Sequence, residues 1–275
     1  MLGFALFASH DAVIKSLGGQ YAVFQIVFFA TLFFFPLLII LLVTDTTSGN
    51  LIPKNPKWIA ARVLASVIAT PSIFYAFTKL ELAEVYTLLF TTPLWVTAMS
   101  VPVLREKVGI RRWGAVLVGF AGVLVVLHPG SIDFSFAHFA ALVGAFGAGF
   151  VFITMRKIGN AERTQVLMIY QALAMIVFMG LLMAPQYRPM ALPDMVSIMV
   201  LSALGFCGML AMIAAYRRAG AAVVAPMQYS QLIWATVFGV LFFAETPDRR
   251  VFIGAAIIIS SGMFILWREH RLTPT

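Results

Sequence analysis

The chain has 275 residues, of which 61% are hydrophobic and only 11% are charged, against about 25% charged residues in an ordinary soluble domain. A soluble globule of this composition would lack the charges needed to cover its surface, and intrinsic disorder requires low hydrophobicity. The formal net charge of +8 would favour nucleic acid as the partner of a soluble protein, so the position of that charge along the chain matters.

Apolar segments follow one another along the chain, most of them near the length of about 20 residues that a spanning helix needs. In chain order they are Leu2–Leu17, Tyr21–Val43, Trp58–Thr78, Ala83–Leu104, Trp113–Leu127, Ala137–Met155, Gln165–Ala184, Met195–Tyr216, Ala221–Phe243 and Val251–Trp267. The first and fifth are short for a full bilayer. Continuous apolar runs favour helices over a barrel, whose strands would alternate. The sequence therefore predicts an all-α polytopic membrane protein with ten transmembrane helices.

The basic residues orient this arrangement. Fourteen of the 19 Lys and Arg residues fall on the face that carries both termini, and the other five fall on the opposite face. Because loops rich in Lys and Arg stay in the cytoplasm, both termini are predicted to be cytoplasmic, which requires an even number of spans. The same bias explains the net charge without nucleic acid. No basic region precedes the first apolar segment, so the chain is expected to start directly with a spanning helix.

The two halves of the chain carry related sequences. At an offset of 139 residues, and of 140 for the glycines, the matching pairs are Phe77 and Tyr216, Trp95 and Trp234, Glu106 and Glu245, Arg111 and Arg250, Gly114 and Gly254, and Gly122 and Gly262. We expect one repeat in residues 1–130 and a second in residues 131–275. Each holds five predicted spans, so the two copies cross the membrane in opposite directions. Such inverted-topology repeats are a common plan of secondary transporters, with the substrate near the midplane.

The repeat has a recognisable signature. The pattern of Pro93, Trp95, Glu106, Arg111, Gly114 and Gly122 resembles the EamA-type repeat of the drug/metabolite transporter superfamily. The second copy departs from it, since Leu232 stands where the first has Pro93. The resemblance covers nearly the whole chain. It implies ten helices with both ends inside, in a bacterial inner (plasma) membrane, and export of amino acids, other metabolites or amphipathic drugs. The YddG-like aromatic amino acid exporters are one similar group.

The first apolar segment contains ionisable residues, which are functional candidates because their burial in a membrane is costly. His10 lies about 15 Å along the helix, near the middle of the bilayer. It is either a neutral, hydrogen-bonded residue or a pH-sensitive group in a cavity. Asp11 and Lys15 are four residues apart and share a helix face, so they are predicted to pair with each other. The alternative is a coupling role, as a switch for protons or for a substrate carboxylate.

The fourth and ninth segments carry polar and aromatic residues on one face. Gln228, Gln231 and Trp234 follow at three-residue steps, and Thr92 and Trp95 are the repeat equivalents of the last two. These residues suit a wet cavity with an aromatic wall. The alternative is hydrogen bonding and packing between helices. The predicted substrate-binding set is Trp95, Trp234, Gln228, Gln231, Thr92, Tyr86, Tyr75 and His10.

Two further features concern helix ends and bends. Glu106 and Glu245 end the fourth and ninth segments beside basic residues. They are expected to form salt bridges or caps there, on opposite sides of the membrane. Pro93 and Pro226 each free a backbone carbonyl and can bend a helix, which makes them candidates for gating.

No enzyme motif is present. The sequence has no GxxxxGK[ST], so ATP-driven transport would need another chain and no ATPase subunit is expected. It has no HExxH and no G-x-S-x-G, its four histidines are scattered, and its single cysteine excludes an internal disulfide. The expectations are therefore no catalytic residue, no metal and no cofactor.

The predicted function is a secondary transporter that exports small amphipathic metabolites by alternating access around a central cavity. Amino acids, including aromatic ones, are the first expectation; S-adenosylmethionine, nucleobases, sugars and drug cations are the alternatives. An intramembrane enzyme or a channel is less favoured. Lys15 is the only embedded basic residue far from the predicted cytoplasmic loops, which argues for neutral, zwitterionic or cationic cargo. The expected partners are a small-molecule substrate and membrane lipid, with no nucleic acid, and the monomer is expected to suffice.

Overall fold

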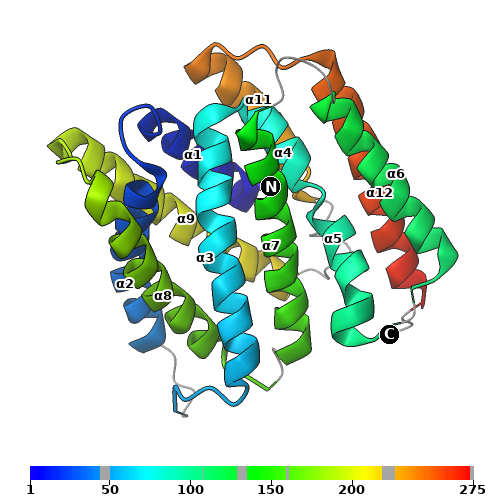
Figure 1. Ribbon diagram of the computed structural model, residues 1–275, viewed down its shortest axis with the longest axis horizontal. Coiled ribbons are helices and arrows are strands. Elements are labelled where there is room, and N and C mark those ends of the chain that lie inside the picture. Colours follow the sequence, from blue (N-terminus) through cyan, green and yellow to red (C-terminus); the bar gives the residue numbers. More distant parts are fainter. Residues whose placement is uncertain (44–49, 107, 129–134, 159–160, 219–226, 273–275) are drawn as a thin grey trace.

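The computed structural model describes residues 1–43, 50–106, 108–128, 135–158, 161–218 and 227–272, and within these ranges all regular secondary structure is helical (Figure 1). The helices are α1 (Leu2–Leu17), α2 (Val23–Val43), α3 (Pro56–Lys79), α4 (Leu82–Leu89), α5 (Thr92–Met99), α6 (Ile110–Leu127), α7 (Phe136–Ile158), α8 (Thr164–Met183), α9 (Leu192–Arg218), α11 (Ser230–Phe243) and α12 (Arg249–Leu272). A π-helical stretch, Ser100–Leu104, extends α5. A 3-10 turn, Ala184–Gln186, ends α8.

Each predicted apolar segment overlaps one of these helices or, for the fourth, two. Within the described residues, seven helical stretches are long and apolar enough to cross a membrane, and α11 is a shorter apolar helix. Large apolar side chains such as Leu181, Leu241 and Phe242 point outward and are each 69% exposed, which suits lipid and not water. The polytopic membrane class is therefore confirmed, whereas the count of ten spans remains a prediction. Pro226 and the start of the ninth predicted segment lie outside the described residues.

The fourth predicted segment is broken in the middle. α4 ends at Leu89, and α5 begins at Thr92 with Pro93 in its first turn. Proline has no N–H to continue the helical hydrogen bonds and clashes with the preceding turn, so the break falls at Pro93. The Thr92 hydroxyl donates to the Leu89 carbonyl at 2.6 Å, and Thr91 donates to the Leu88 carbonyl at 2.7 Å. The Leu88 carbonyl also accepts the backbone N–H of Thr91, whereas the Leu89 carbonyl would face the N–H that Pro93 lacks, so the Thr92 hydroxyl takes the place of that donor.

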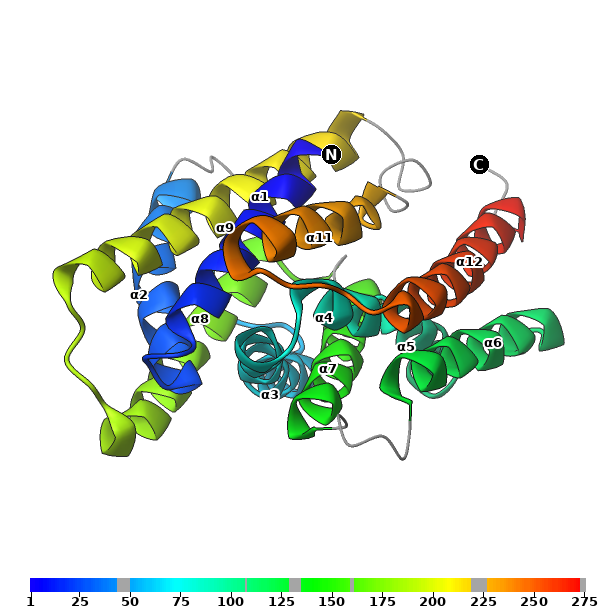
Figure 2. The ribbon, with the colours of Figure 1, turned by 90° about the horizontal axis from the view of Figure 1, so that it is seen from above.

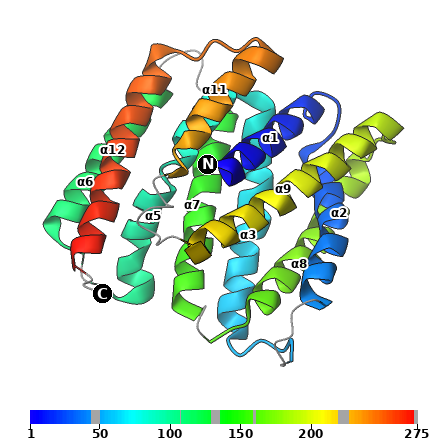
Figure 3. The ribbon, with the colours of Figure 1, turned by 180° about the vertical axis from the view of Figure 1, so that it is seen from behind.

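Helices from the first and second parts of the chain pack against one another. α3 runs along α7, α1 along α9, α2 along α8 and α6 along α12. Seen from above, α2 and α8 lie toward one end of the molecule and α6 and α12 at the other, with α3, α4, α7 and α11 between them (Figure 2). From behind, α9 crosses the molecule beside α1 (Figure 3). The buried core therefore lies between the two parts of the chain.

Candidate functional site

A cavity of about 440 Å³ lies between α1, α2, α3, α8 and α9, so both parts of the chain line it. Its volume falls in the range of about 300–1,000 Å³ found for small-molecule sites. The wall is largely apolar and contains three aromatic rings and several thioethers. These side chains are Phe7, Phe34, Phe74, Met168, Met175 and Met209. The polar groups are fewer: His10, Thr31, Arg62, Thr70, Gln171 and Ser202.

One polar group of the cavity is a guanidinium. Arg62 lies on α3, and its Nη1 donates to the Gln171 side-chain oxygen at 2.8 Å and to the Leu167 carbonyl at 3.2 Å, both on α8. Its Nε is buried and has no hydrogen-bond partner. Among the described residues no carboxylate forms an ion pair with Arg62. Arg62 is one of the fourteen basic residues counted from the sequence on the face that carries both termini. Its position within the predicted segment Trp58–Thr78 was the signal that it lies inside the bundle.

A second set of polar contacts begins at His10, on α1. Its Nδ1 lies 2.7 Å from Asp11 Oδ1, and its ring meets that of Phe74 edge-on at 6.0 Å. The second oxygen of Asp11 accepts a hydrogen bond from the Tyr86 hydroxyl, and the Gln231 side chain hydrogen-bonds to Tyr86. Three members of the predicted site, His10, Tyr86 and Gln231, are thus joined through Asp11, although only His10 lines the cavity.

The predicted pairing of Asp11 with Lys15 is wrong. The Lys15 ammonium lies 2.5 Å from Glu245 Oε1 and donates to the Leu80 carbonyl. The other oxygen of Glu245 accepts the backbone N–H of Leu82 at 2.9 Å, at the start of α4. Asp11 is occupied by His10 and Tyr86, which leaves Glu245 as the acidic partner within reach of the end of α1.

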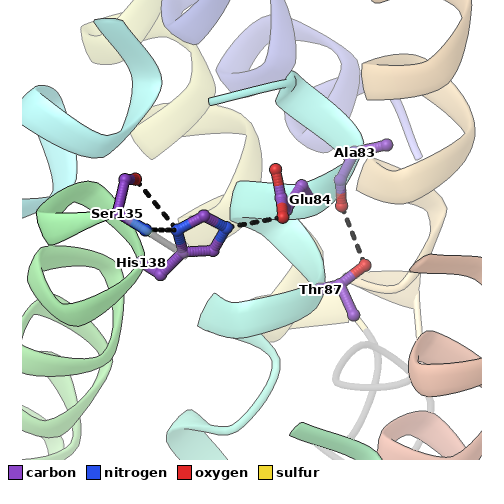
Figure 4. Close-up of polar contacts among 5 residues, drawn as sticks. All are labelled: Ala83, Glu84, Thr87, Ser135 and His138. Atoms are coloured by element: carbon purple, nitrogen blue, oxygen red, sulfur yellow. Dashed lines mark hydrogen bonds and ion pairs between the residues drawn. The ribbon is translucent and has the colours of Figure 1, made fainter. Parts of the chain in front are cut away.

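A second contact joins the two parts of the chain at the start of α4 and α7. Nε2 of His138 lies 2.8 Å from a carboxylate oxygen of Glu84 (Figure 4). The backbone N–H of Ser135 donates to Nδ1 of His138 at 3.0 Å. Since Nδ1 must then be an acceptor, Nε2 carries the proton and donates to Glu84. The sequence analysis missed this contact, because Glu84 and His138 are 54 residues apart and form no motif.

The predicted helix-end role of the two glutamates is borne out in geometry, but with partners on other helices. Arg156, in the last turn of α7, lies 2.9 Å from Glu106, just as Lys15, in the last turn of α1, meets Glu245. Each glutamate follows a residue with positive φ, Arg105 at 58° and Ala244 at 53°. The N–H groups of Glu106 and Glu245 also donate to the carbonyls of Ser100 and Gly239, respectively. The same local structure therefore recurs at an offset of 139 residues.

The remaining predicted site residues lie away from this cavity. The Trp95 ring packs edge-on against Phe120 and Phe146, with centroids 4.7 and 5.2 Å away. Trp234 lies beside Phe238. Tyr75 lines a second cavity of about 520 Å³, between α2, α3 and α7, whereas its neighbour Phe74 faces the first. The residues that line neither cavity are Trp95, Trp234, Gln228, Gln231, Thr92 and Tyr86.

The described part of the chain contains no group of three or more His, Cys, Asp or Glu side chains that could hold a metal ion. The chemistry of the site is therefore that of its hydrogen-bonding groups, its rings and its few charges. These groups can bind and orient an organic molecule.

Comparisons with known proteins agree with a membrane carrier. The model of the EamA-like transporter family matches residues 1–128 and 135–267. The chain is 31% identical over 219 residues to a riboflavin transporter of Vibrio cholerae, covering 78% of this chain and 72% of that one. It is 26% identical over 268 residues to an S-adenosylmethionine uptake transporter of Rickettsia felis, covering 96% and 90%. A solved crystal structure shares the fold, with a TM-score of 0.66 over 97% of both chains at 17% identity.

Proposed function

We propose, since the chain belongs to the EamA-like transporter family, that this multi-pass membrane protein is a secondary transporter of a small heteroaromatic metabolite. The observation that carries the proposal is the wall of the cavity, which combines the rings of Phe7, Phe34 and Phe74 with methionine side chains. Aromatic rings stack on or meet the edge of a flat heterocycle, and thioethers adapt their shape to it. The few polar groups would fix its orientation.

The length of the cavity supports cargo larger than an amino acid. Arg62 and Phe74 both line it and are twelve residues apart on α3, which is about 18 Å at 1.5 Å per residue. A single amino acid would fill only part of that length. A flavin or an adenosyl compound would fill more of it, and the two relatives are named for the transport of such molecules.

Export of amino acids, including aromatic ones, is the second candidate. It is favoured by the same three phenylalanine rings, which would also accept an indole or phenyl side chain. The experiment below therefore includes tryptophan, so that the two cargo classes are tested side by side.

The contacts between the two parts of the chain support alternating access. The cavity extends toward the start of α3 and of α8, at Arg62 and Met168, which are the lower ends of these helices in Figure 1. At the opposite ends, Lys15 meets Glu245 and Glu84 meets His138. If the Lys- and Arg-rich loops are cytoplasmic, the cavity opens toward the cytoplasmic side of the inner membrane, and both termini lie on that side.

An inverted repeat would supply the second conformation. The family model matches the chain in two stretches, and the Glu106 and Glu245 regions share one local structure. Both observations support two five-helix halves in a ten-helix protein. Exchange of the conformations of the two halves would close the present cavity and open one on the other side.

Counterflow in proteoliposomes tests the proposal. Liposomes preloaded with unlabelled riboflavin, S-adenosylmethionine or tryptophan are given the labelled form of the same compound. We expect saturable uptake of riboflavin or S-adenosylmethionine, and a fall of about tenfold or more in Phe34→Ala, a loss of about 1.4 kcal/mol of binding. Phe242→Ala is the control, because Phe242 is 69% exposed on the outer face of α11.

The three outcomes lead to different conclusions. Saturable uptake of tryptophan alone would make amino acids the cargo. If Phe34→Ala and Phe242→Ala lowered uptake equally, the cavity would not be part of the transport pathway. Absence of saturable uptake of all three compounds, from protein shown to be folded, would contradict the proposed cargo class.

A further inference from the structure

Arg62 is a charged side chain in an apolar cavity whose charge has no described counter-ion. Its guanidinium carries five N–H donors, and the hydrogen bonds to Leu167 and Gln171 both come from Nη1. The Nε atom is buried without a partner. Charged residues inside a membrane protein are expensive, and they normally pair with one another or mark a substrate path. A guanidinium held in this way has donors left with which it can bind an anion.

The acidic groups of the neighbouring elements are already engaged. Glu162, just before α8, accepts hydrogen bonds from the backbone and side chain of Asn55, just before α3. Asp11 on α1 is bonded to His10 and Tyr86. Neither carboxylate forms an ion pair with Arg62. No described carboxylate therefore neutralises the guanidinium, and an anion can reach it through the cavity that Arg62 lines.

Gln171 adds a second donor to the same place. Its side-chain oxygen accepts the hydrogen bond from Arg62 at 2.8 Å, which fixes that oxygen toward the cation. An amide nitrogen carries two donors of its own, and Gln171 also lines the cavity. Arg62 and Gln171 together can thus donate several hydrogen bonds to one oxyanion, in the planar fork that suits carboxylate and phosphate groups.

We infer that Arg62 and Gln171 form a binding subsite for an anionic group, a carboxylate or a phosphate, carried by the transported molecule. The inference rests on the proposed function and narrows its substrate class to a metabolite with an anion at one end and an aromatic ring at the other. The ring then lies against Phe34 and Phe74, farther along the cavity. The expectation of neutral, zwitterionic or cationic cargo rested on Lys15 alone, and Lys15 is paired with Glu245.

The test uses pairs of probes that differ in the anionic group and share the ring system. The pairs are flavin mononucleotide and riboflavin for a phosphate, and S-adenosylmethionine and its decarboxylated form for a carboxylate. Tryptophan and tryptamine form a third pair with a smaller ring. Binding to the purified full chain in lipid nanodiscs is measured by fluorescence or calorimetry. We expect the anionic member of at least one pair to bind about tenfold or more tightly than its partner.

The variants then assign that preference to Arg62. Arg62→Gln should bring the anionic probe down to the affinity of its partner and leave the partner unchanged, which also shows that the variant is folded. Arg62→Lys should keep part of the preference, because it keeps the charge but loses the fork. Lys57→Gln is the matched control: Lys57 lies on the same helix near the same end and is exposed, so its removal should change no affinity.

The outcomes separate this inference from the proposed function. Equal affinities within every pair, or an equal loss for both members in Arg62→Gln, would overturn the subsite even if riboflavin is transported. A preference confined to tryptophan over tryptamine, and lost in Arg62→Gln, would support the subsite and move the cargo to amino acids.

Discussion

The Lys15 ammonium at the end of α1 lies 2.5 Å from the carboxylate of Glu245, which follows α11. Both side chains are largely buried, with 16% and 6% of their surface exposed. The corresponding contact between Arg156 and Glu106 is far more open, at 48% and 34%. Since the solvent screens exposed pairs strongly, the two contacts should differ widely in their effect on stability although the repeat relates them.

Lys15→Met should destabilise the protein by about 3–5 kcal/mol, because it leaves the buried carboxylate of Glu245 without its cation. Arg156→Met should cost at most about 1 kcal/mol. Unfolding in detergent measures both. The double variant Lys15→Met, Glu245→Gln should recover part of the loss, since it removes the unpaired charge. Equal losses in the two single variants would contradict this account.

Glu81 gives a prediction about pH. It precedes α4, outside the spanning stretch that begins at Leu82. Burial, and then the neighbouring carboxylates of Glu245 and Glu84, raise the pKa of Glu81 above its usual value. A raised folded-state pKa means that ionisation of Glu81 favours the unfolded chain. The stabilising contribution of protonated Glu81 is complete below the pKa of about 4.3 that a glutamate has in the unfolded chain. It is lost as the pH rises through the higher pKa of Glu81 in the folded protein.

Glu81→Gln should therefore raise the melting temperature at pH 7 to 8, and this gain should vanish as the pH falls to about 4. Glu106→Gln serves as a comparison, because Glu106 is paired with Arg156 and its negative charge therefore favours the folded state. That variant should show no gain at neutral pH. A gain for Glu81→Gln that is the same at every pH would point to packing and not to charge.

Two glycines aligned by the repeat should respond differently to alanine. A Cβ at Gly254 would lie 2.8 Å from the Gly122 carbonyl and would collide with the Val126 side chain, whereas a Cβ at Gly114 would meet nothing within 4 Å. Gly254→Ala should cost about 1–3 kcal/mol by overpacking the contact between α6 and α12. Gly114→Ala should be neutral or stabilising, since alanine favours the helix by about 1 kcal/mol. Thermal unfolding of the two variants checks both values, and equal behaviour would refute the close packing at Gly254.

The sequence predicted most of the fold because hydrophobicity and length are local properties of a spanning helix. The first segment is reproduced to the residue as α1, and most of the others differ by a few residues at their ends. The fourth segment is instead divided into α4 and α5, and the start of the ninth lies outside the described residues. Partners across the bundle were harder to predict. Helical spacing put Asp11 beside Lys15, but Tyr86 and Glu245 approach them from other helices.

The site shows the same limit. Composition and spacing indicated a cavity with an aromatic wall, and the sequence-based prediction assigned that wall to tryptophans on the fourth and ninth segments. The structure shows Trp95 packed against Phe120 and Phe146, and phenylalanines on α1, α2 and α3 line the cavity instead. Twenty-five phenylalanines give no sequence signal that separates a cavity wall from a surface in lipid. Among the residues that line the cavity, Arg62 and His10 were the distinctive ones, because each is an ionisable residue within an apolar segment.

We expect Asp11 to be a residue through which a pH gradient would act on transport, because of its two contacts. It is hydrogen-bonded to His10, which lines the cavity, and to Tyr86, which is buried behind it. Protonation of Asp11 would weaken both contacts, because its charge strengthens each of them.

Asp11→Asn should therefore abolish any stimulation of uptake by a pH gradient while counterflow without a gradient persists. Tyr86→Phe removes one contact and leaves the Asp11 carboxyl group in place, so it should keep the stimulation at a reduced rate. Parallel uptake assays in proteoliposomes, with and without a pH gradient, measure both. Stimulation of equal size in the wild type and in Asp11→Asn would assign proton coupling to another residue.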